Sequence, residues 1–250
     1  MIDSAPERIT PISSDPTPSR SRRTQGKGPG RGNGVRLKRK RGFADSMAFL
    51  LSAALSPYIV IPVGTVGIVY ARTPKSASMQ DFFVWAALSL FFSTALPLAY
   101  ILVGMRRGTI SDVHVMEKDQ RGAPFVIAII GGFLAAFLLY LLHAPPSVWG
   151  LSVIQAVNGL AILAINQVTK ISVHVSVLSA TVLGATVLHP PFPPYAFVWL
   201  IPLLIWARAR RGRHSLAQGI AGFFVSSTIT TLVIAGLGLS DRLAYFWQRL

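Results

Sequence analysis

Long uncharged segments constrain this chain more than any other feature. From residue 46 onward, apolar stretches follow one another and are separated by short polar or proline-rich links. A helix needs about 20 mostly apolar residues to cross the hydrocarbon core of a bilayer. Backbone polar groups in lipid must also be hydrogen-bonded within the protein, and a helix does this by itself. The sequence therefore predicts an all-α, polytopic bundle of transmembrane helices.

Seven segments fit this description, although the sixth is short and contains Pro202, so we expect six to seven spans. Prolines at 143–147 and 189–195 indicate tight links between spans, because proline lacks the N–H that would continue a helix. The expected spans are 46–71, 79–105, 124–143, 147–167, 171–189, 193–207 and 215–238.

The first 45 residues differ in kind from the rest. They carry 11 of the 24 Lys and Arg residues and are rich in Pro, Gly and Ser. Such a composition cannot bury enough apolar surface to order itself, so we expect a disordered basic tail at 1–45 and a membrane domain at 46–250. The RLKRKR cluster at 36–41 directly precedes an apolar segment, which favours contact with anionic lipid headgroups over a nucleic-acid arm. No nucleic acid partner is expected.

The distribution of charge predicts an orientation. With seven spans, the tail shares one side of the membrane with 106–123, 168–170 and 208–214. That side carries nine Lys and Arg residues beyond the tail, against four on the other side. Basic loops stay in the cytoplasm. We therefore expect an integral protein of a bacterial inner membrane, with its N-terminus in the cytoplasm.

Most titratable groups of the membrane domain lie on this same side, in clusters at 112–121, 170–174 and 208–218. Several cations suit a phosphate, and the planar fork of arginine can bind two of its oxygens at once. Two histidines add a nucleophile and a general acid near neutral pH. The sequence therefore indicates a phosphate site on the side of the tail.

A plainer alternative is that each histidine is merely interfacial. It fits His143 and His189, each of which ends a span beside prolines without basic neighbours. His174 and His214 differ, because two separate basic clusters each contribute one of them. Ionisable groups near hydrocarbon are costly and usually mark a functional site.

The third cluster resembles the third motif of the type 2 phosphatidic acid phosphatase family, SRxxxxxHxxxD. Here Ala207 and Arg208 are followed, after five residues, by His214 and, after three more, by Gln218. The chain departs from the motif at Ala207, which lacks the hydroxyl, and at Gln218, which replaces the acid.

The other two motifs of the family are matched in part. Residues 171–174, ISVH, resemble the second motif, PSGH, with Val173 in place of glycine. The first motif, KxxxxxxRP, is matched only by Arg121, since His114 stands at the lysine position and Gly122 at the proline position. The three segments follow the family's order over residues 106–225.

The resemblance implies a membrane phosphatase that needs no metal or other cofactor. It implies that His214 attacks phosphorus and forms a phosphohistidine, and that His174 protonates the departing oxygen. Gln218 would orient His214 in place of the family's Asp. An amide oxygen can accept the ring N–H but lacks the charge that stabilises an imidazolium.

The resemblance also implies which groups hold the phosphoryl oxygens: Arg208, Arg121, Ser172 and the backbone N–H of Val173. Lys170 is a further candidate from its own spacing, because it lies four residues before His174 and shares a helix face with it. The expected substrate is a lipid phosphate or a polyprenyl diphosphate, whose apolar tail can remain in the bilayer.

Three alternatives stay open. A catalytically weak or inactive lipid- or phosphate-binding protein of the same fold would explain Gln218. A Mg²⁺-dependent transferase would need clustered carboxylates, whereas the membrane domain has five acidic residues and no DxxDG or NxxxD arrangement. A transporter would need polar residues at mid-membrane depth, and Gln155 and Asn158 form the one suggestive pair.

Overall fold

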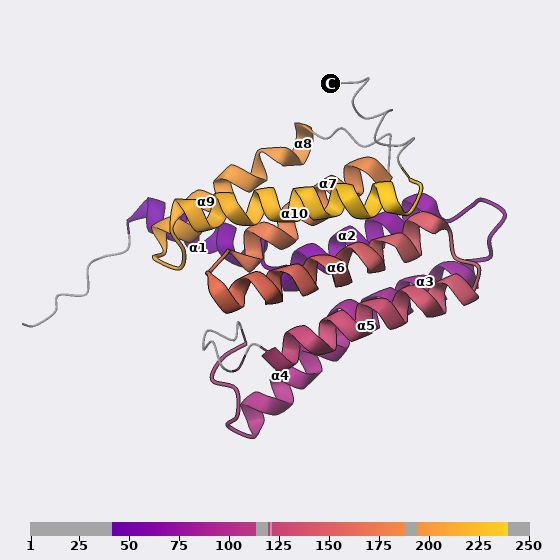
Figure 1. The fold of residues 1–250 in the computed structure, drawn as a ribbon, viewed down its shortest axis with the longest axis horizontal. Coiled ribbons are helices and arrows are strands. Elements are labelled where there is room, and N and C mark those ends of the chain that lie inside the picture. The colour runs from indigo at the N-terminus through magenta and orange to yellow at the C-terminus, as the bar shows by residue number, and fades with distance from the viewer. Residues whose placement is uncertain (1–41, 114–119, 121, 189–194, 240–250) are drawn as a thin grey trace, which may run out of the picture. The chain divides into compact units, whose positions relative to one another are not determined.

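The computed structural model describes residues 42–113, 120, 122–188 and 195–239. Helices joined by short links account for these residues, and no strand occurs among them (Figure 1). The prediction of an all-helical domain is thus confirmed over this part of the chain. Helix begins at Phe43, three residues before the expected boundary. The tail up to residue 41 lies outside the described residues.

The first expected span is bent in two. Helix α1 (Phe43–Ala54) and helix α2 (Pro57–Arg72) meet at an angle of 49°. Pro57 causes the break, because it has no N–H to continue α1 and disfavours helical dihedrals at the residue before it. Ser56 accordingly adopts an extended conformation as the N-cap of α2.

The second expected span is a single helical segment of 28 residues with one wide turn. It consists of α3 (Met79–Leu90), the π-helix η1 (Phe91–Ala95) and α4 (Leu96–Arg106). Pro97 cannot donate a hydrogen bond to the carbonyl of Ser93, so the regular α-helical hydrogen-bond pattern is interrupted here. The N–H of Leu96 instead reaches the carbonyl of Phe91, five residues back.

Three further long helices complete the scaffold: α5 (Gly122–Leu141), α6 (Pro146–Val168) and α10 (Leu216–Gly236). Small residues let them approach closely, as is common between membrane helices. A Cβ placed on Gly132 of α5 would lie 2.9 Å from the Cβ of Ala156 on α6. Asn158 of α6 donates to Thr230 of α10 at 3.0 Å.

The remaining helices are short. Helix α7 (Val173–Leu188) has 16 residues and α9 (Leu200–Arg210) has 11, with the single turn α8 (Tyr195–Val198) before it. At 1.5 Å per residue, α7 and α9 measure about 24 and 17 Å, less than the roughly 30 Å of a hydrocarbon core. Four helical segments are long and apolar enough to cross a membrane, or five if the bent α1–α2 pair is one span. The expected count of six to seven is not confirmed.

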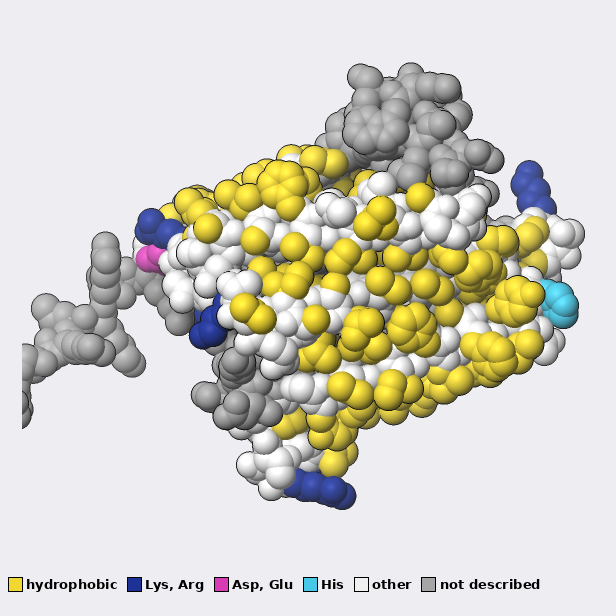
Figure 2. All heavy atoms as spheres, in the orientation of Figure 1, with side chains coloured by type: hydrophobic (Ala, Val, Ile, Leu, Met, Phe, Trp, Pro, Cys, Tyr) yellow, Lys and Arg dark blue, Asp and Glu magenta, His cyan; other side chains and the backbone are white. Residues whose placement is uncertain are grey.

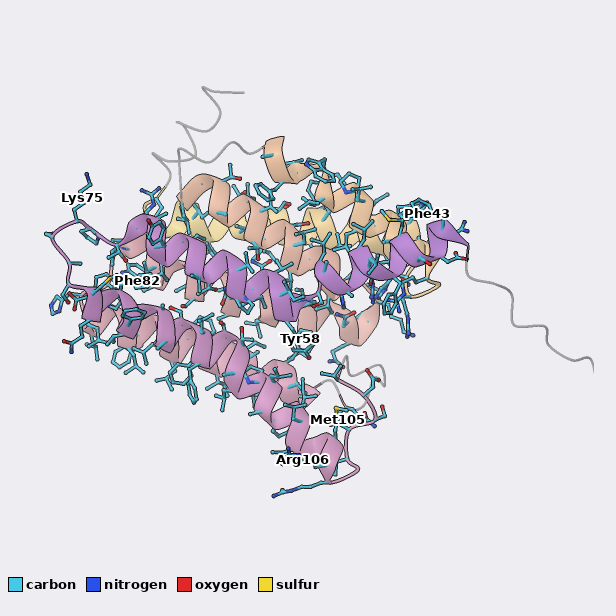
Figure 3. All side chains as sticks on the ribbon, turned by 180° about the vertical axis from the view of Figure 1, so that it is seen from behind. Phe43, Tyr58, Lys75, Phe82, Met105 and Arg106 are labelled. Atoms are coloured by element: carbon cyan, nitrogen blue, oxygen red, sulfur yellow. The ribbon has the colours of Figure 1, made fainter. Side chains whose placement is uncertain are left out.

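The exterior fits a membrane environment. Figure 2 shows hydrophobic side chains over most of one face, with Lys and Arg gathered toward its ends. Large apolar side chains are exposed, including Ile130, Phe137, Phe224 and Leu232. In Figure 3, Phe43 and Lys75 lie at opposite ends of the bundle, and Arg106 lies at the lower tip of the segment that ends with α4.

Candidate phosphate site

A glycine turn directs the third basic cluster back toward the bundle. Helix α9 ends in a Schellman motif, in which the N–H of Gly212 bonds to Ala209 and the N–H of Arg213 bonds to Arg208. The motif needs a residue in the left-handed region, and Gly212 supplies it with φ +63°. This turn brings Arg213 and His214 back beside the last turn of α9.

The start of α7 is fixed against the start of α10. The N–H of Ser172 donates to the carbonyl of Gln218 at 3.2 Å, and the hydroxyl of Ser176 donates to the carbonyl of Gly222. Gly222 permits this approach, since a Cβ there would lie 3.1 Å from the carbonyl oxygen of Ser172. The second and third sequence clusters are thereby in direct contact.

A cavity of about 360 Å³ opens between these segments and helices α2, η1, α5 and α6. At one end it is lined by Lys170, His174, Arg208, Arg213 and His214; we call this the basic end. Lys170 and Arg213 are exposed, His214 is half-buried and His174 is buried. None of the described lining residues is Asp or Glu. The electrostatics of the basic end therefore favour an anion.

The burial of Arg208 is the strongest argument that the basic end binds an anion. Its side chain is only 7% exposed, and its Nη1 donates to the hydroxyl of Ser52 on α1 at 3.0 Å. Within the described part of the chain, its Nε is buried without an acceptor and no carboxylate pairs with it. A buried charge is costly unless it is paired and hydrogen-bonded. A ligand oxyanion in the cavity would supply the negative charge that the described residues do not place beside Arg208.

The charge of Arg208 persists at neutral pH. Burial, with smaller contributions from the like charges of Arg211 and Arg213, lowers the pKa of Arg208 to about 10. The residue lies in the last turn of α9, just after the expected sixth span of 193–207. Because its pKa stays well above 7, the guanidinium remains a cation facing the cavity.

The side-chain oxygen of Gln218 holds the ring of His214. Its Oε1 lies 3.1 Å from Nδ1 of His214 and also accepts the N–H of Ser215 at 3.1 Å. An acceptor at Nδ1 assigns the ring proton to that nitrogen, which leaves the lone pair on Nε2. The hydroxyl of Ser215 accepts the N–H of Gln218 in return, so the pair forms the capping box of α10. Gln218 thus favours the tautomer of His214 with its proton on Nδ1.

The structure brings most of the predicted site residues together. Lys170, Val173, His174, Arg208 and His214 line the cavity. Gln218 contacts His214. Ser172 is fully buried beside the cavity, and its hydroxyl has no partner in the described part of the chain. Arg121 lies outside the described residues, as does His114.

Other lining residues were not singled out from the sequence. Arg213 belongs to the third cluster, so its charge was visible, but its direction depends on the turn at Gly212. Tyr58, on α2, lines the cavity and donates to the carbonyl of Val113 at 2.7 Å. Ser52 supports Arg208 from an apolar helix. No sequence signal marks Tyr58 or Ser52, because their roles arise only from tertiary packing.

The donor set does not resemble a metal centre. Among the residues that the structure describes, no three His, Cys, Asp or Glu side chains gather closely enough to hold a metal ion. Comparison with known proteins adds no assignment: no family model, no curated protein and no solved structure matches the chain. Its function must therefore be argued from the cavity itself.

If His214 is the nucleophile that the motif resemblance implies, replacing Gln218 with glutamate is expected to raise the rate constant of hydrolysis several-fold. Glutamate can keep the capping box, and its charge would stabilise the imidazolium and raise the pKa of His214. Because His214 must be neutral to attack, the acid limb of the profile of kcat/KM against pH should move to higher pH. The measurement is that profile for Gln218→Glu beside the native protein. An unchanged acid limb would show that Gln218 does not act on the nucleophile.

Proposed function

We propose that this chain is a membrane phosphatase that hydrolyses a lipid phosphate or diphosphate through a histidine nucleophile and without a metal ion. One observation carries the proposal: His174, His214 and the buried Arg208 line a single cavity. This is the meeting of the second and third motif segments that the resemblance to the type 2 phosphatidic acid phosphatase family requires.

The chemistry follows from the two imidazoles. Nε2 of His214 attacks phosphorus and forms a P–N bond, while the bond from phosphorus to the leaving oxygen breaks. His174, in its protonated form, gives that oxygen a proton. Water then attacks the phosphohistidine as His174 takes a proton from it, which releases phosphate and restores both rings. Arg208, Lys170 and Arg213 neutralise the charge on the phosphoryl oxygens throughout.

The N-terminus of α7 supports the same assignment. Its first N–H groups have no helical partner and carry the positive end of the helix dipole. Val173 and His174 form that first turn and line the cavity. The backbone N–H of Val173 and the hydroxyl of Ser172 are proposed as further donors to the phosphoryl group, with Arg121 as a fourth cation.

The proposed substrate is a lipid because apolar side chains line much of the cavity, among them Ile101, Phe125, Ile162 and Val177. We further propose that α7 and the segment ending at Ala207 act as short spans, which gives six to seven crossings and leaves Arg208 in the link that follows. The site then faces the cytoplasm of a bacterial inner membrane, where the basic tail contacts anionic lipid. The chain lacks cysteine, so labelling a cysteine introduced at Ser111 with an impermeant thiol reagent tests this orientation.

A binding protein without turnover is the second candidate. The observation that favours it is the capping box of α10, which accounts for Gln218 by helix stability alone. Such a protein would bind a lipid phosphate at Arg208 and release no phosphate from it.

Phosphate release by the purified chain in detergent tests the proposal. With excess chelator, we expect release from at least one member of a panel of phosphatidate, phosphatidylglycerophosphate and polyprenyl diphosphate. Saturable binding of the panel without release would favour the second candidate. Release that chelator abolishes would contradict the metal-free mechanism.

A further inference from the structure

One face of α1 contacts the arginines at the end of α9. Three side chains of α1, spaced four and three residues apart, lie on this face, and each meets a different arginine. The contacts are Asp45 with Arg210 at 2.9 Å, the ring centroid of Phe49 with the guanidinium carbon of Arg211 at 4.9 Å, and Ser52 with Arg208 at 3.0 Å. Of these three arginines, only Arg208 lines the cavity. The contact with Ser52 is therefore the one that bears on the anion site.

Packing of α1 on α9 holds Ser52 beside Arg208. Ser52 is 1% exposed, and Ala48, one turn earlier on the same face, is 0% exposed. Such small side chains let two helices approach closely. Ser52 lies in the last turn of α1, just before the chain bends by 49° into α2. Its hydroxyl is thus buried between two helices and not carried on a loose loop.

The hydroxyl of Ser52 orients the guanidinium of Arg208. Within the described part of the chain it is the one acceptor for that side chain, through Nη1. Nε is buried without an acceptor, whereas Nη2, which also has none there, is not buried. Because Arg208 lines the cavity, Nη2 is left as the donor that an anion in the cavity can reach.

We propose that Ser52 is a positioning residue for the anion site, which anchors Nη1 of Arg208 so that Nη2 is directed into the cavity. A group that is ordered beforehand loses less conformational entropy when a ligand binds. Without the hydroxyl, Arg208 keeps its charge but is free to turn away. The site thereby depends on a residue outside 106–225, the range that resembles the phosphatase motifs. This inference rests on the anion site of the proposed function, but not on its chemical step.

The test is the affinity for dodecylphosphonate, whose P–C bond cannot be hydrolysed as a phosphate ester can. Calorimetry on the full chain in detergent should show binding at least about tenfold weaker in Ser52→Ala, as expected for one hydrogen bond to a charged group. Ser46→Ala makes the same exchange on an exposed side of α1 and should bind like the native chain. Unchanged affinity in Ser52→Ala would overturn the proposal.

Ser52→Cys separates the hydrogen bond from packing and serves if Ser52→Ala does not fold. Cysteine has nearly the shape of serine, but its sulfur is a weak acceptor. Binding should therefore weaken about as much as in Ser52→Ala. Native affinity in Ser52→Cys would assign Ser52 to packing alone and would overturn the proposal.

A double-mutant cycle tests whether Ser52 acts through Arg208. In the Arg208→Leu background, Ser52→Ala should change the affinity by less than about twofold. A further tenfold loss there would mean that Ser52 acts independently of Arg208, against the proposal.

Phosphate release separates this inference from the proposed function. If the Ser52 variants weaken phosphonate binding while the native chain releases phosphate from no lipid phosphate, the phosphatase proposal fails and the role of Ser52 stands. If Ser52→Ala releases phosphate with native KM and kcat, the phosphatase proposal stands and the role of Ser52 fails.

Discussion

Replacing His214 with alanine is expected to lower kcat/KM for lipid phosphate hydrolysis by at least about 10⁴-fold. Loss of a nucleophile removes the covalent route altogether, and comparable nucleophile deletions in other hydrolases cost about 10⁶-fold. Binding should survive, because Arg208, Lys170 and Arg213 still surround the phosphate. The measurement is phosphate release under kcat/KM conditions, with affinity for dodecyl phosphate measured in parallel.

His143 provides the matched control. It is exposed in the link between α5 and α6 and does not line the cavity, so His143→Ala should retain full activity. A covalent phosphoprotein trapped by acid quench from the native chain should be absent in His214→Ala. Native-like turnover by His214→Ala would remove the nucleophile assignment and with it the proposed mechanism.

Replacing Arg208 with leucine is expected to lower activity without lowering thermal stability. Activity should fall by about 10²–10³-fold, as when one donor to a developing oxyanion is removed. Thermal stability of the ligand-free protein should stay level or rise, because an apolar side chain replaces a buried cation that no carboxylate of the described residues pairs with. The stabilisation that a phosphate ligand confers on the native chain should disappear, since it depends on binding to the folded state.

Arg210 is the control for this second result. It lies two residues away, pairs with Asp45 at 2.9 Å and is exposed to solvent. Surface pairs of this kind are worth about 0–1 kcal/mol, so Arg210→Leu should change both activity and melting temperature little. Strong destabilisation by Arg208→Leu would mean that Arg208 serves the packing of α1 on α9, and not an anion.

Where a hydrophobic segment ends in a clear signal, the sequence predicted the helix closely. The expected spans 79–105, 147–167 and 215–238 differ from the observed helices by at most two residues at either end. Ser78 and Ser215 cap two of these helices with capping boxes. The bend at Pro57 was not predicted, because the apolar run continues through it. The shortness of the sixth segment, which contains most of α9, was predicted from its length and Pro202.

The contacts within the site were also predicted only in part. The motif resemblance implied that Gln218 orients His214, and the two side chains do meet. His214 precedes Ser215, the N-cap of α10, and is outside the helix. The meeting of Arg208 with His174 depends on how α7 and α9 pack, and only the motif resemblance suggested it. Asn158 was visible as a polar residue in a span, but its hydrogen bond to Thr230, 72 residues away, depends on the packing of α6 against α10.

The 28-residue segment from Met79 to Arg106 has a mechanical consequence for the surrounding lipid. At 1.5 Å per residue its uncharged part, 82–105, measures about 36 Å, roughly 6 Å more than a typical hydrocarbon core. Hydrophobic mismatch of this sign is relieved by tilting the helix or by locally thickening the bilayer. Arg106 in its last turn can also extend its guanidinium to the headgroups. The protein is therefore better suited to thick bilayers than to thin ones.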